Sequence, residues 1–258
     1  MKRFAIAAIV ACFALPLALA AADLTPQQLI EKSNDATVSA GSVHQLEMTI
    51  TNKRGETQSQ KMLTRTKTYK GHPAKVTTFL YPEESKGTKF LLVENKDRED
   101  DMKIYIPDLR RVRTISTTQR NQNYMGTDFS YADLEALNAN VGQHAINGAD
   151  TVDGQACTKM TTILDPKKGP GYSKMITWFR ADNFVAVKTE YYDKDGALLK
   201  VKTVEGLYKD GNVWVQKRIV MKNVQTSHQT VIETRKVEQK VVDDSFFTDQ
   251  FLQQTDRL

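Results

Sequence analysis

Side chains that could carry out catalysis or bind a metal are few and scattered along this sequence. The four histidines stand far apart, without the i, i+4 spacing of a helical ligand pair and without a neighbouring set of Cys or Glu ligands: His44, His72, His144 and His228. The sequence contains neither a Gly-x-Ser-x-Gly nucleophile motif nor a glycine-rich phosphate loop. The sequence therefore predicts a protein that is not an enzyme and that needs neither a metal nor a cofactor.

The two cysteines also give no sign of thiol chemistry. Cys157 alternates with apolar neighbours, so we expect a buried and unreactive thiol. A catalytic thiol would require a histidine partner, and none can be assigned to it. Cys12 lies in the apolar N-terminal run, where a lipid attachment motif is an alternative that its very early position disfavours.

The N-terminal residues have the pattern of a secretory signal peptide. Lys2 and Arg3 precede an apolar run that is broken only by Pro16 and ends in Ala-x-Ala sequences. A transmembrane anchor is the weaker alternative, because Pro16 and the small residues suit cleavage better. We therefore predict a signal peptide over residues 1–22, one exported domain over residues 23–258, and a periplasmic location.

The net charge of the chain indicates which classes of binding partner to expect. Removing Lys2 and Arg3 from the 36 basic residues leaves 34 against 31 acidic residues, a net charge near +3. An exported chain rarely meets nucleic acid, so we expect none as a partner. Mild basicity suits anionic membrane surfaces or acidic patches on other proteins.

The central stretch, residues 102–135, is the most informative part of the chain. Met102, Ile104 and Ile106 alternate with polar residues, as in a half-buried strand that ends at Pro107. The basic residues that follow form a solvated strand face or a surface for docking to an acidic partner or lipid headgroups: Arg110, Arg111 and Arg113.

After a polar run at 116–123, large apolar side chains crowd around a glycine in a segment without strand periodicity. Ser130 can cap a short helix that begins at Tyr131. We interpret this segment as a lid over an apolar cleft, although an ordinary loop packed on the core is an alternative. The predicted lid residues are Tyr124, Met125, Gly126, Asp128, Phe129 and Tyr131.

Alternating apolar and polar residues continue through most of the chain and predict ten or eleven strands at hairpin spacing. One helix is expected after Thr25, which can form a capping box with Gln28. Turn residues at 147–154 are expected to separate two strands. A sheet of this length must curl or close, and its apolar side would then be concave.

The apolar residues expected on the inward side of the strands are candidates for a lipid-binding cavity, although a packed core is the alternative for any of them: Leu46, Met48, Ile50, Phe79, Phe90, Leu92, Ile104, Met160, Trp178 and Met221.

Three motifs in the central stretch and in the segment 82–92 before it belong together: Gly87-Thr88 with Leu91, Tyr105-Ile106-Pro107 before Arg110, and the run from Gly126 to Leu134, GTDFSYADL. In these motifs the chain resembles the LolA-like outer-membrane lipoprotein-sorting family. Thr127 stands where the family usually has Ser, and Met102 and Lys103 stand where a Trp is frequent.

The resemblance implies a mainly β (α+β) fold, an unclosed antiparallel β-barrel like those of LolA and LolB, with short helices as a lid over an apolar cavity. It implies a monomeric carrier that takes acyl chains of lipoproteins or lipids from an inner-membrane transporter to an outer-membrane acceptor and comes transiently close to membranes. A periplasmic lipid sensor that regulates a signalling partner is the alternative. The sequence leaves open whether the cargo is a lipoprotein, a free lipid or a hydrophobic metabolite.

Overall fold

The structure is a computed structural model that describes residues 24–95, 98–166 and 171–254. The predicted signal peptide, residues 1–22, lies outside the described residues. None of the helices in these ranges is long and apolar enough to cross a membrane.

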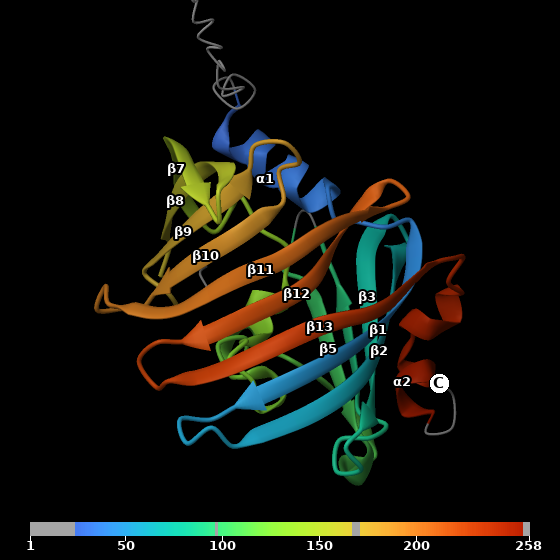
Figure 1. The fold of residues 1–258 in the computed structure, drawn as a ribbon. Helices are drawn as coiled ribbons and strands as arrows, with labels where there is room; N and C mark the ends of the chain where they lie inside the picture. The colour runs from blue at the N-terminus through green and yellow to red at the C-terminus, as the bar shows by residue number, and fades with distance from the viewer. Residues whose placement is uncertain (1–23, 96–97, 167–170, 255–258) are drawn as a thin grey trace, which may run out of the picture.

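The chain forms one antiparallel sheet of 13 strands that curls without closing (Figure 1). The strand order is β6-β5-β4-β3-β2-β1-β13-β12-β11-β10-β9-β8-β7, so β6 and β7 are the two edges. The strands are β1 (Gly41–Thr51), β2 (Thr57–Tyr69), β3 (His72–Tyr81), β4 (Lys89–Val93), β5 (Asp101–Ile106), β6 (Arg111–Thr114), β7 (Gly142–Val152), β8 (Gln155–Leu164), β9 (Lys174–Arg180), β10 (Ala186–Tyr192), β11 (Leu198–Asp210), β12 (Val213–Asn223) and β13 (His228–Gln239).

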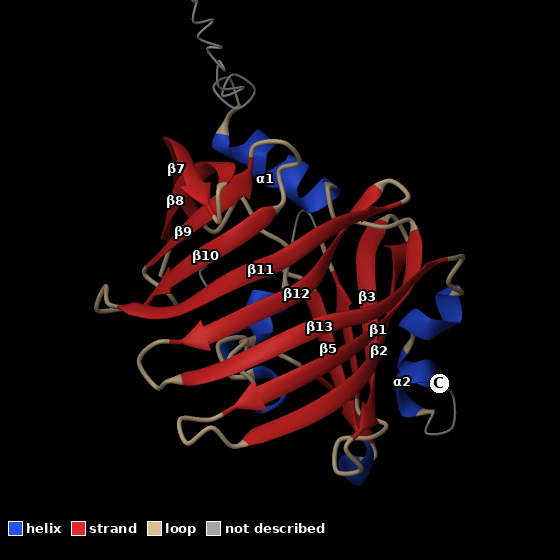
Figure 2. Cartoon of the chain, viewed as in Figure 1, coloured by secondary structure: helices blue, strands red, loops and turns tan. Residues whose placement is uncertain are grey.

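The helices are short (Figure 2). Helix α1 (Pro26–Asp35) begins with the predicted capping box between Thr25 and Gln28. The others are helix α2 (Asp249–Gln253) and five 3-10 helices, η1 (Pro107–Leu109), η2 (Thr117–Gln119), η3 (Tyr124–Gly126), η4 (Tyr131–Leu134) and η5 (Asp244–Phe247).

The structure has two more strands than the sequence predicted, β6 and β7. The prediction of turn residues over 147–154 is wrong for residues 147–152, because β7 continues to Val152 and only Asp153 and Gly154 form the turn. A register shift between Ile146 and Gly148 shows a bulge, which lets the edge strand accommodate turn-forming residues.

Different segments of the chain cover the two faces of the sheet. We call the face that carries Met48, Phe79 and Phe90 the inner face; it is covered by α1 and by η3 and η4. We call the opposite face the outer face. Over β2–β5 it is covered by the C-terminal segment, where Phe247, Phe251 and Leu252 are buried against the sheet.

Candidate functional site

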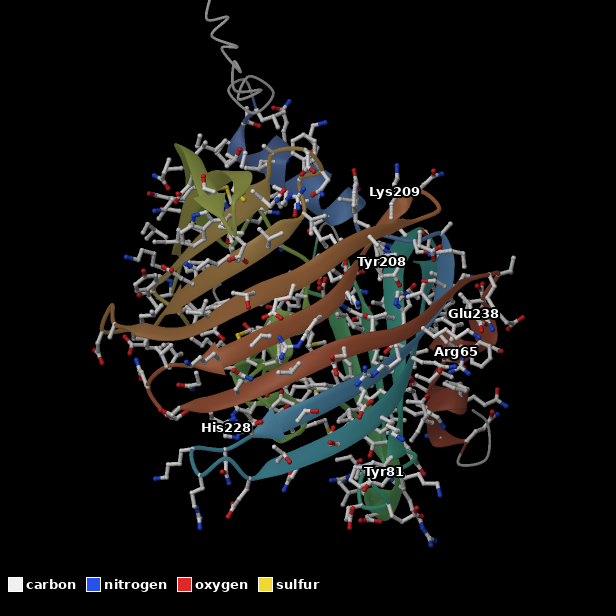
Figure 3. The ribbon with its side chains drawn as sticks, viewed as in Figure 1. Arg65, Tyr81, Tyr208, Lys209, His228 and Glu238 are labelled. Atoms are coloured by element: carbon white, nitrogen blue, oxygen red, sulfur yellow. The ribbon has the colours of Figure 1, made fainter. Side chains whose placement is uncertain are left out.

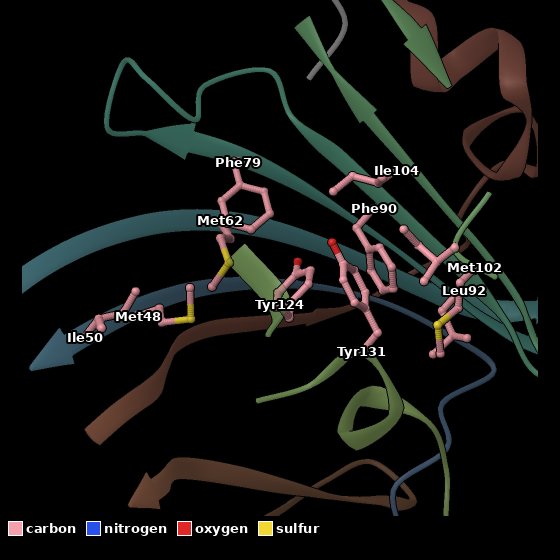
Figure 4. Packing of buried hydrophobic residues seen from close by; sticks show 11 residues of the cluster. Met48, Ile50, Met62, Phe79, Phe90, Leu92, Met102, Ile104, Tyr124 and Tyr131 are labelled. Carbon is pink, nitrogen blue, oxygen red and sulfur yellow. The ribbon is translucent and has the colours of Figure 1, made fainter. Parts of the chain in front are cut away.

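Apolar side chains of β1 to β5 form one cluster on the inner face (Figure 4). Seven of the ten residues predicted from the sequence belong to this cluster or pack against it: Leu46, Met48, Ile50, Phe79, Phe90, Leu92 and Ile104. Met62, Met102 and Ile115 complete it and were not among the predicted residues. Three thioether side chains in one cluster give a surface that can adapt its shape to a flexible partner.

Met160 and Met221 lie on the same face, in the other half of the sheet. One cross-strand row of directly paired residues runs from β8 to β1: Met160, Thr177, Thr189, Lys202, Met221, Thr230 and Ile50. Directly paired residues share a face of a sheet, so these seven side chains stand on one side. Met160 packs with Leu29 and Ile30 of α1, whereas Met221 packs with Phe129.

The inward placement expected for Trp178 is wrong. Trp178 follows Thr177 in β9, and successive side chains of a strand point to opposite faces. Its ring lies 4.4 Å from the ammonium of Lys188 and 5.1 Å from that of Lys159, and its indole N–H donates to Asp150 over 2.8 Å. Register and charged neighbours therefore place this ring on the face opposite to Met160.

The segment 123–134, which we call the flap, is hydrogen-bonded mainly to itself. Asn123 and Ser130 form an isolated bridge, and the amide of Tyr124 donates to the carbonyl of Phe129 over 2.7 Å. Met125 and Gly126 adopt left-handed backbone conformations, with φ of 48° and 75°. Ser130 caps η4 in a capping box with Asp133, as the sequence predicted.

Three aromatic rings of the flap point onto the inner face. Tyr124 lies 5.1 Å from Phe90 and 6.0 Å from Phe79, and Tyr131 lies 5.7 Å from Phe90, measured between ring centroids. Phe129 packs in the other half of the sheet, beside Met221. The three rings are 4–9% exposed, so in this conformation the flap itself fills the space over the inner face.

Asp128 attaches the flap to β13, which lies over it in the view of Figure 2. Its carboxylate accepts from Thr230 Oγ1 over 2.7 Å and lies 2.8 Å from Nδ1 of His228. Its amide donates to the hydroxyl of Thr230 over 3.0 Å. The side chain of Asp128 is only 4% exposed, so these bonds satisfy a carboxylate that is removed from water.

Asp133 attaches the flap to β11 through a buried ion pair. Lys200 Nζ lies 2.6 Å from Asp133 Oδ2, and the two side chains are 6% and 1% exposed. Lys200 also donates to the carbonyl of Asp128, and the hydroxyl of Tyr172 donates to Asp133 over 3.0 Å. Burial, together with the negative charge of Asp133, raises the pKa of Tyr172, which therefore stays a neutral donor.

Two more lysines face this end of the flap. Lys75 Nζ donates to the carbonyl of Leu134 over 2.6 Å. Lys202, two residues from Lys200 on the same face of β11, makes no hydrogen bond or ion pair with any residue in the described ranges. Burial lowers the pKa of the Lys202 ammonium, with the charges of Lys75 and Lys200 acting in the same direction and Asp133 opposing them.

The three predicted docking arginines lie at the edge of the sheet and are exposed. Arg111 and Arg113 pair with Ile106 and Ile104, so both stand on the inner face, at its rim. Arg110 follows η1 in a left-handed conformation. Within the described parts of the chain, none of the three forms an ion pair.

The arrangement closest to a catalytic site is a serine–histidine contact. Ser42 Oγ lies 2.8 Å from Nε2 of His44 and 2.7 Å from the hydroxyl of Thr66. Ser42 has no exposed surface, and burial lowers the pKa of His44 although Asp210 opposes this. A substrate could not reach this hydroxyl. Nor do the described residues include a cluster of three His, Cys, Asp or Glu side chains able to hold a metal ion.

Four residues that hold the flap were not predicted from the sequence: Tyr172, Lys200, His228 and Thr230. They lie 39 to 102 positions from their partners in the flap. Lys200 and His228 lie in strands with many polar residues, so the local sequence pattern does not indicate that their side chains are removed from water. Only the strand order brings them together over the flap.

Comparisons with known proteins agree with this architecture. A family model described as an uncharacterized protein matches residues 71–254, more than half of the chain. A comparison with curated proteins finds no significant match.

Solved structures show the same fold. A putative outer membrane lipoprotein-sorting protein domain from Vibrio parahaemolyticus is 26% identical with a TM-score of 0.80, and the match covers 87% of this chain and 97% of that one. A DUF1329 family protein from Desulfovibrio piger is 24% identical with a TM-score of 0.80, covering 87% and 96%. A LolA superfamily protein from Nitrosomonas europaea is 15% identical with a TM-score of 0.69, covering 88% and 99%. The chain therefore belongs to the family that this model describes, a family with the LolA-like fold.

Proposed function

We propose that this protein is a periplasmic carrier that binds an acyl chain of a lipoprotein or lipid on its inner face, in the place that the flap now fills. The observation that carries the proposal is the flap itself: three aromatic rings cover the methionine-rich apolar side of the sheet, but in the described residues no backbone–backbone hydrogen bond joins the flap to a strand. The 26% identical relative is described as a putative lipoprotein-sorting domain, which supports the same cargo class.

The flap can leave as a unit because it takes no part in the sheet. Among the described residues, the backbone–backbone hydrogen bonds of residues 124–135 all end within residues 120–135. Its contacts with the sheet are aromatic packing and hydrogen bonds in which at least one partner is a side chain. Asp128 bonds to Thr230 and Lys200, Asp133 bonds to Lys200, and the carbonyl of Leu134 accepts from Lys75. Polar bonds of this kind can be replaced by bonds to water once the flap moves out.

An acyl chain can compensate for the apolar contacts that the flap gives up. Each buried methylene contributes about 0.8 kcal/mol, so ten methylenes contribute about 8 kcal/mol. Burying three aromatic side chains is worth a similar amount, about 2–3 kcal/mol each. Exchange of flap for acyl chain is therefore close to balanced, as a carrier that must both load and release its cargo requires.

Transfer of this kind needs no covalent step. We infer a monomer whose partners are the cargo, an inner-membrane transporter and an outer-membrane acceptor, with no nucleic acid involved. The exposed arginines at the rim are suited to an acidic partner or to lipid headgroups at the moment of transfer.

The test compares two neighbouring positions of β1. Met48→Gln places an amide on the inner face, where the wild-type side chain is completely buried, whereas Thr49→Gln places it on the outer face as the matched control. We expect binding of a fluorescent fatty-acid probe to weaken about tenfold in Met48→Gln and to stay unchanged in Thr49→Gln, because the amide loses its hydrogen bonds to water beneath a bound acyl chain.

Circular dichroism establishes that both variants are folded, and mass spectrometry of lipid co-purified from the periplasm identifies the cargo. Equal probe binding by folded Met48→Gln and Thr49→Gln proteins, or a periplasmic protein free of co-purified lipid, would contradict the proposal.

A further inference from the structure

A pocket opens on the outer face of the sheet, on the side opposite to the flap. Its volume is about 330 Å³, and it lies between β1, β2, β13 and the residues that lead into η5. Five apolar and five polar residues line it: Val43, Leu63, Val241, Val242 and Phe246, with Gln45, Arg65, Lys236, Glu238 and Lys240. The volume is at the lower end of the range for small-molecule sites, so the pocket suits a compact ligand.

Arg65 is the unusual member of this lining. The residue is only 6% exposed, and its guanidinium lies 4.3 Å from the ring centroid of Phe246 and 5.9 Å from that of Phe251. Nη1 is buried and has no hydrogen-bond partner in the described structure. Burial lowers the pKa of this guanidinium, which shows that the environment disfavours the charge.

The aromatic rings compensate this charge only in part. Stacking over a ring stabilises a cation but does not satisfy N–H donors that have left water. A buried, charged donor without an acceptor is costly, and the usual partner of a guanidinium is a carboxylate or phosphate that meets its planar donors side by side.

The mouth of the pocket is also basic. Lys236 and Lys240 both pair with Glu238, at 2.5 Å and 3.1 Å. The lining of the pocket therefore has three positively charged side chains, those of Arg65, Lys236 and Lys240, and one carboxylate, that of Glu238. Arg65 and Glu238 both lie on the side of the molecule that carries the C-terminal segment (Figure 3).

The walls of the pocket are fixed to the sheet. Lys67 Nζ donates to the carbonyl of Val242 over 2.8 Å and forms an ion pair with Asp244. Phe251, which lies beside the Arg65 guanidinium, is 1% exposed. The pocket is thus bounded by a strand face on one side and by an anchored segment on the other.

We propose that this outer-face pocket binds a small organic carboxylate with an apolar body, whose carboxylate meets Arg65 while its body packs against Val43, Leu63 and Phe246. The ligand is chemically and spatially distinct from an acyl cargo on the inner face. An apolar molecule without an anionic group would leave the guanidinium unsatisfied and is therefore disfavoured.

The test uses 4-phenylbutyrate as the probe and 4-phenylbutanol as its neutral counterpart, with chemical shifts of the full mature chain as the readout. We expect 4-phenylbutyrate to shift residues of β1, β2 and β13 around the pocket. The neutral alcohol is expected to bind at least about tenfold more weakly, and added salt to weaken only the carboxylate.

Two variants address the charges separately. Arg65→Gln is expected to lower affinity for 4-phenylbutyrate about tenfold, because it removes the charged partner. Glu238→Gln keeps Arg65 and the buried packing, and removal of its negative charge is expected to tighten binding about two- to fivefold. Glu233→Gln is the matched control, because Glu233 also lies on β13 and pairs with a basic neighbour, Arg235, but does not line the pocket.

The proposal is overturned if 4-phenylbutyrate causes no shifts at about 10 mM, a concentration that would detect even weak binding. Equal affinity for the alcohol, shifts confined to the inner face, or weaker binding by Glu238→Gln would overturn it as well. The Glu238 variant keeps the test decisive if Arg65→Gln does not fold. Because the inner face is not involved, none of these results depends on whether an acyl chain binds there.

Discussion

Glu135 shows how strongly one residue at the end of the flap depends on its surroundings. Burial, with a contribution from the neighbouring Asp100, raises its pKa to about 7, although an ion pair with Arg120 at 2.8 Å opposes the shift. Arg120 also donates to the carbonyl of Asp100 over 2.6 Å, so it joins the flap to the β4–β5 loop. The protonation of this carboxyl is therefore linked to the stability of the flap end.

The direction of the pH effect follows from that pKa. In the unfolded chain Glu135 ionises near its ordinary value, while in the folded chain it holds its proton until about pH 7. Its contribution to stability is thus complete below about pH 4 and is lost as the pH rises through 7. We expect Glu135→Gln to remove this loss, so that between pH 5 and pH 8 the free energy of unfolding falls by about 1–3 kcal/mol less than in the wild type.

Denaturant unfolding at the two pH values measures the difference. The exposed carboxylate of Glu31 on α1 provides the control, because Glu31→Gln should leave the difference between pH 5 and pH 8 as it is in the wild type. A Glu135→Gln protein with the wild-type pH dependence would show that the carboxyl is already ionised at pH 5.

At the scale of elements, the flap combines two properties that rarely occur together. Its aromatic rings are buried as deeply as the core, yet in the described residues none of its backbone–backbone hydrogen bonds reaches a strand of the sheet. The buried pairs of Asp128 and Asp133 hold it against β11 and β13. These pairs and the buried rings hold the flap closed when no ligand is bound, and an acyl chain can displace it because water replaces the bonds of the pairs.

Hydrogen exchange tests whether the flap moves. Addition of a fatty acid to the wild type should increase exchange across residues 123–134 while the strands stay protected, because an acyl chain takes the place of the rings. Phe129→Ser removes one ring and should increase exchange in the flap without ligand, with a loss of about 3 kcal/mol in its closing free energy.

Phe247→Ser is the control for a general loss of packing. Phe247 is also buried, at 3% exposure, but lies on the outer face. This variant should lower global stability and leave flap exchange at the wild-type level. Exchange in 123–134 that is identical with and without bound fatty acid would mean that the flap is fixed core packing.

On the scale of the whole molecule, the open sheet places a basic edge beside an apolar face. Arg111 and Arg113 stand on the exposed edge strand β6, opposite Ile106 and Ile104. A closed barrel would have no such edge, because its first and last strands would pair. Because this edge is open, the arginines of β6 and the apolar inner face can contact the same membrane or partner surface.

We expect Arg111→Gln/Arg113→Gln to weaken binding to vesicles that contain anionic lipid by about 1 kcal/mol per arginine. Lys53→Gln/Arg54→Gln removes two exposed charges from the β1–β2 turn and should have a smaller effect. Sedimentation with vesicles at two salt concentrations measures both. Equal losses in the two double variants would indicate net charge alone rather than a docking edge.

Local sequence patterns predicted where most strands and helix α1 lie, but not the total number of strands. Eleven strands followed from alternation, and the caps at Thr25 and Ser130 were predicted correctly because capping depends on residues three positions apart. The edge strands β6 and β7 were missed. β6 is short and basic and β7 contains turn-forming residues, and an edge strand tolerates both because one side of it needs no partner.

The mainly β class, the apolar face of most strands and the unusual aromatic segment at 124–131 could be predicted from the sequence. These features depend on periodicity and composition, which neighbouring residues express directly. Three other features are seen only in the folded chain: Trp178 faces away from Met160, Lys200 and His228 hold the flap, and Arg65 is buried beneath Phe246. Each of these outcomes depends on strand register or on contacts across many residues, and local pattern carries no information about either.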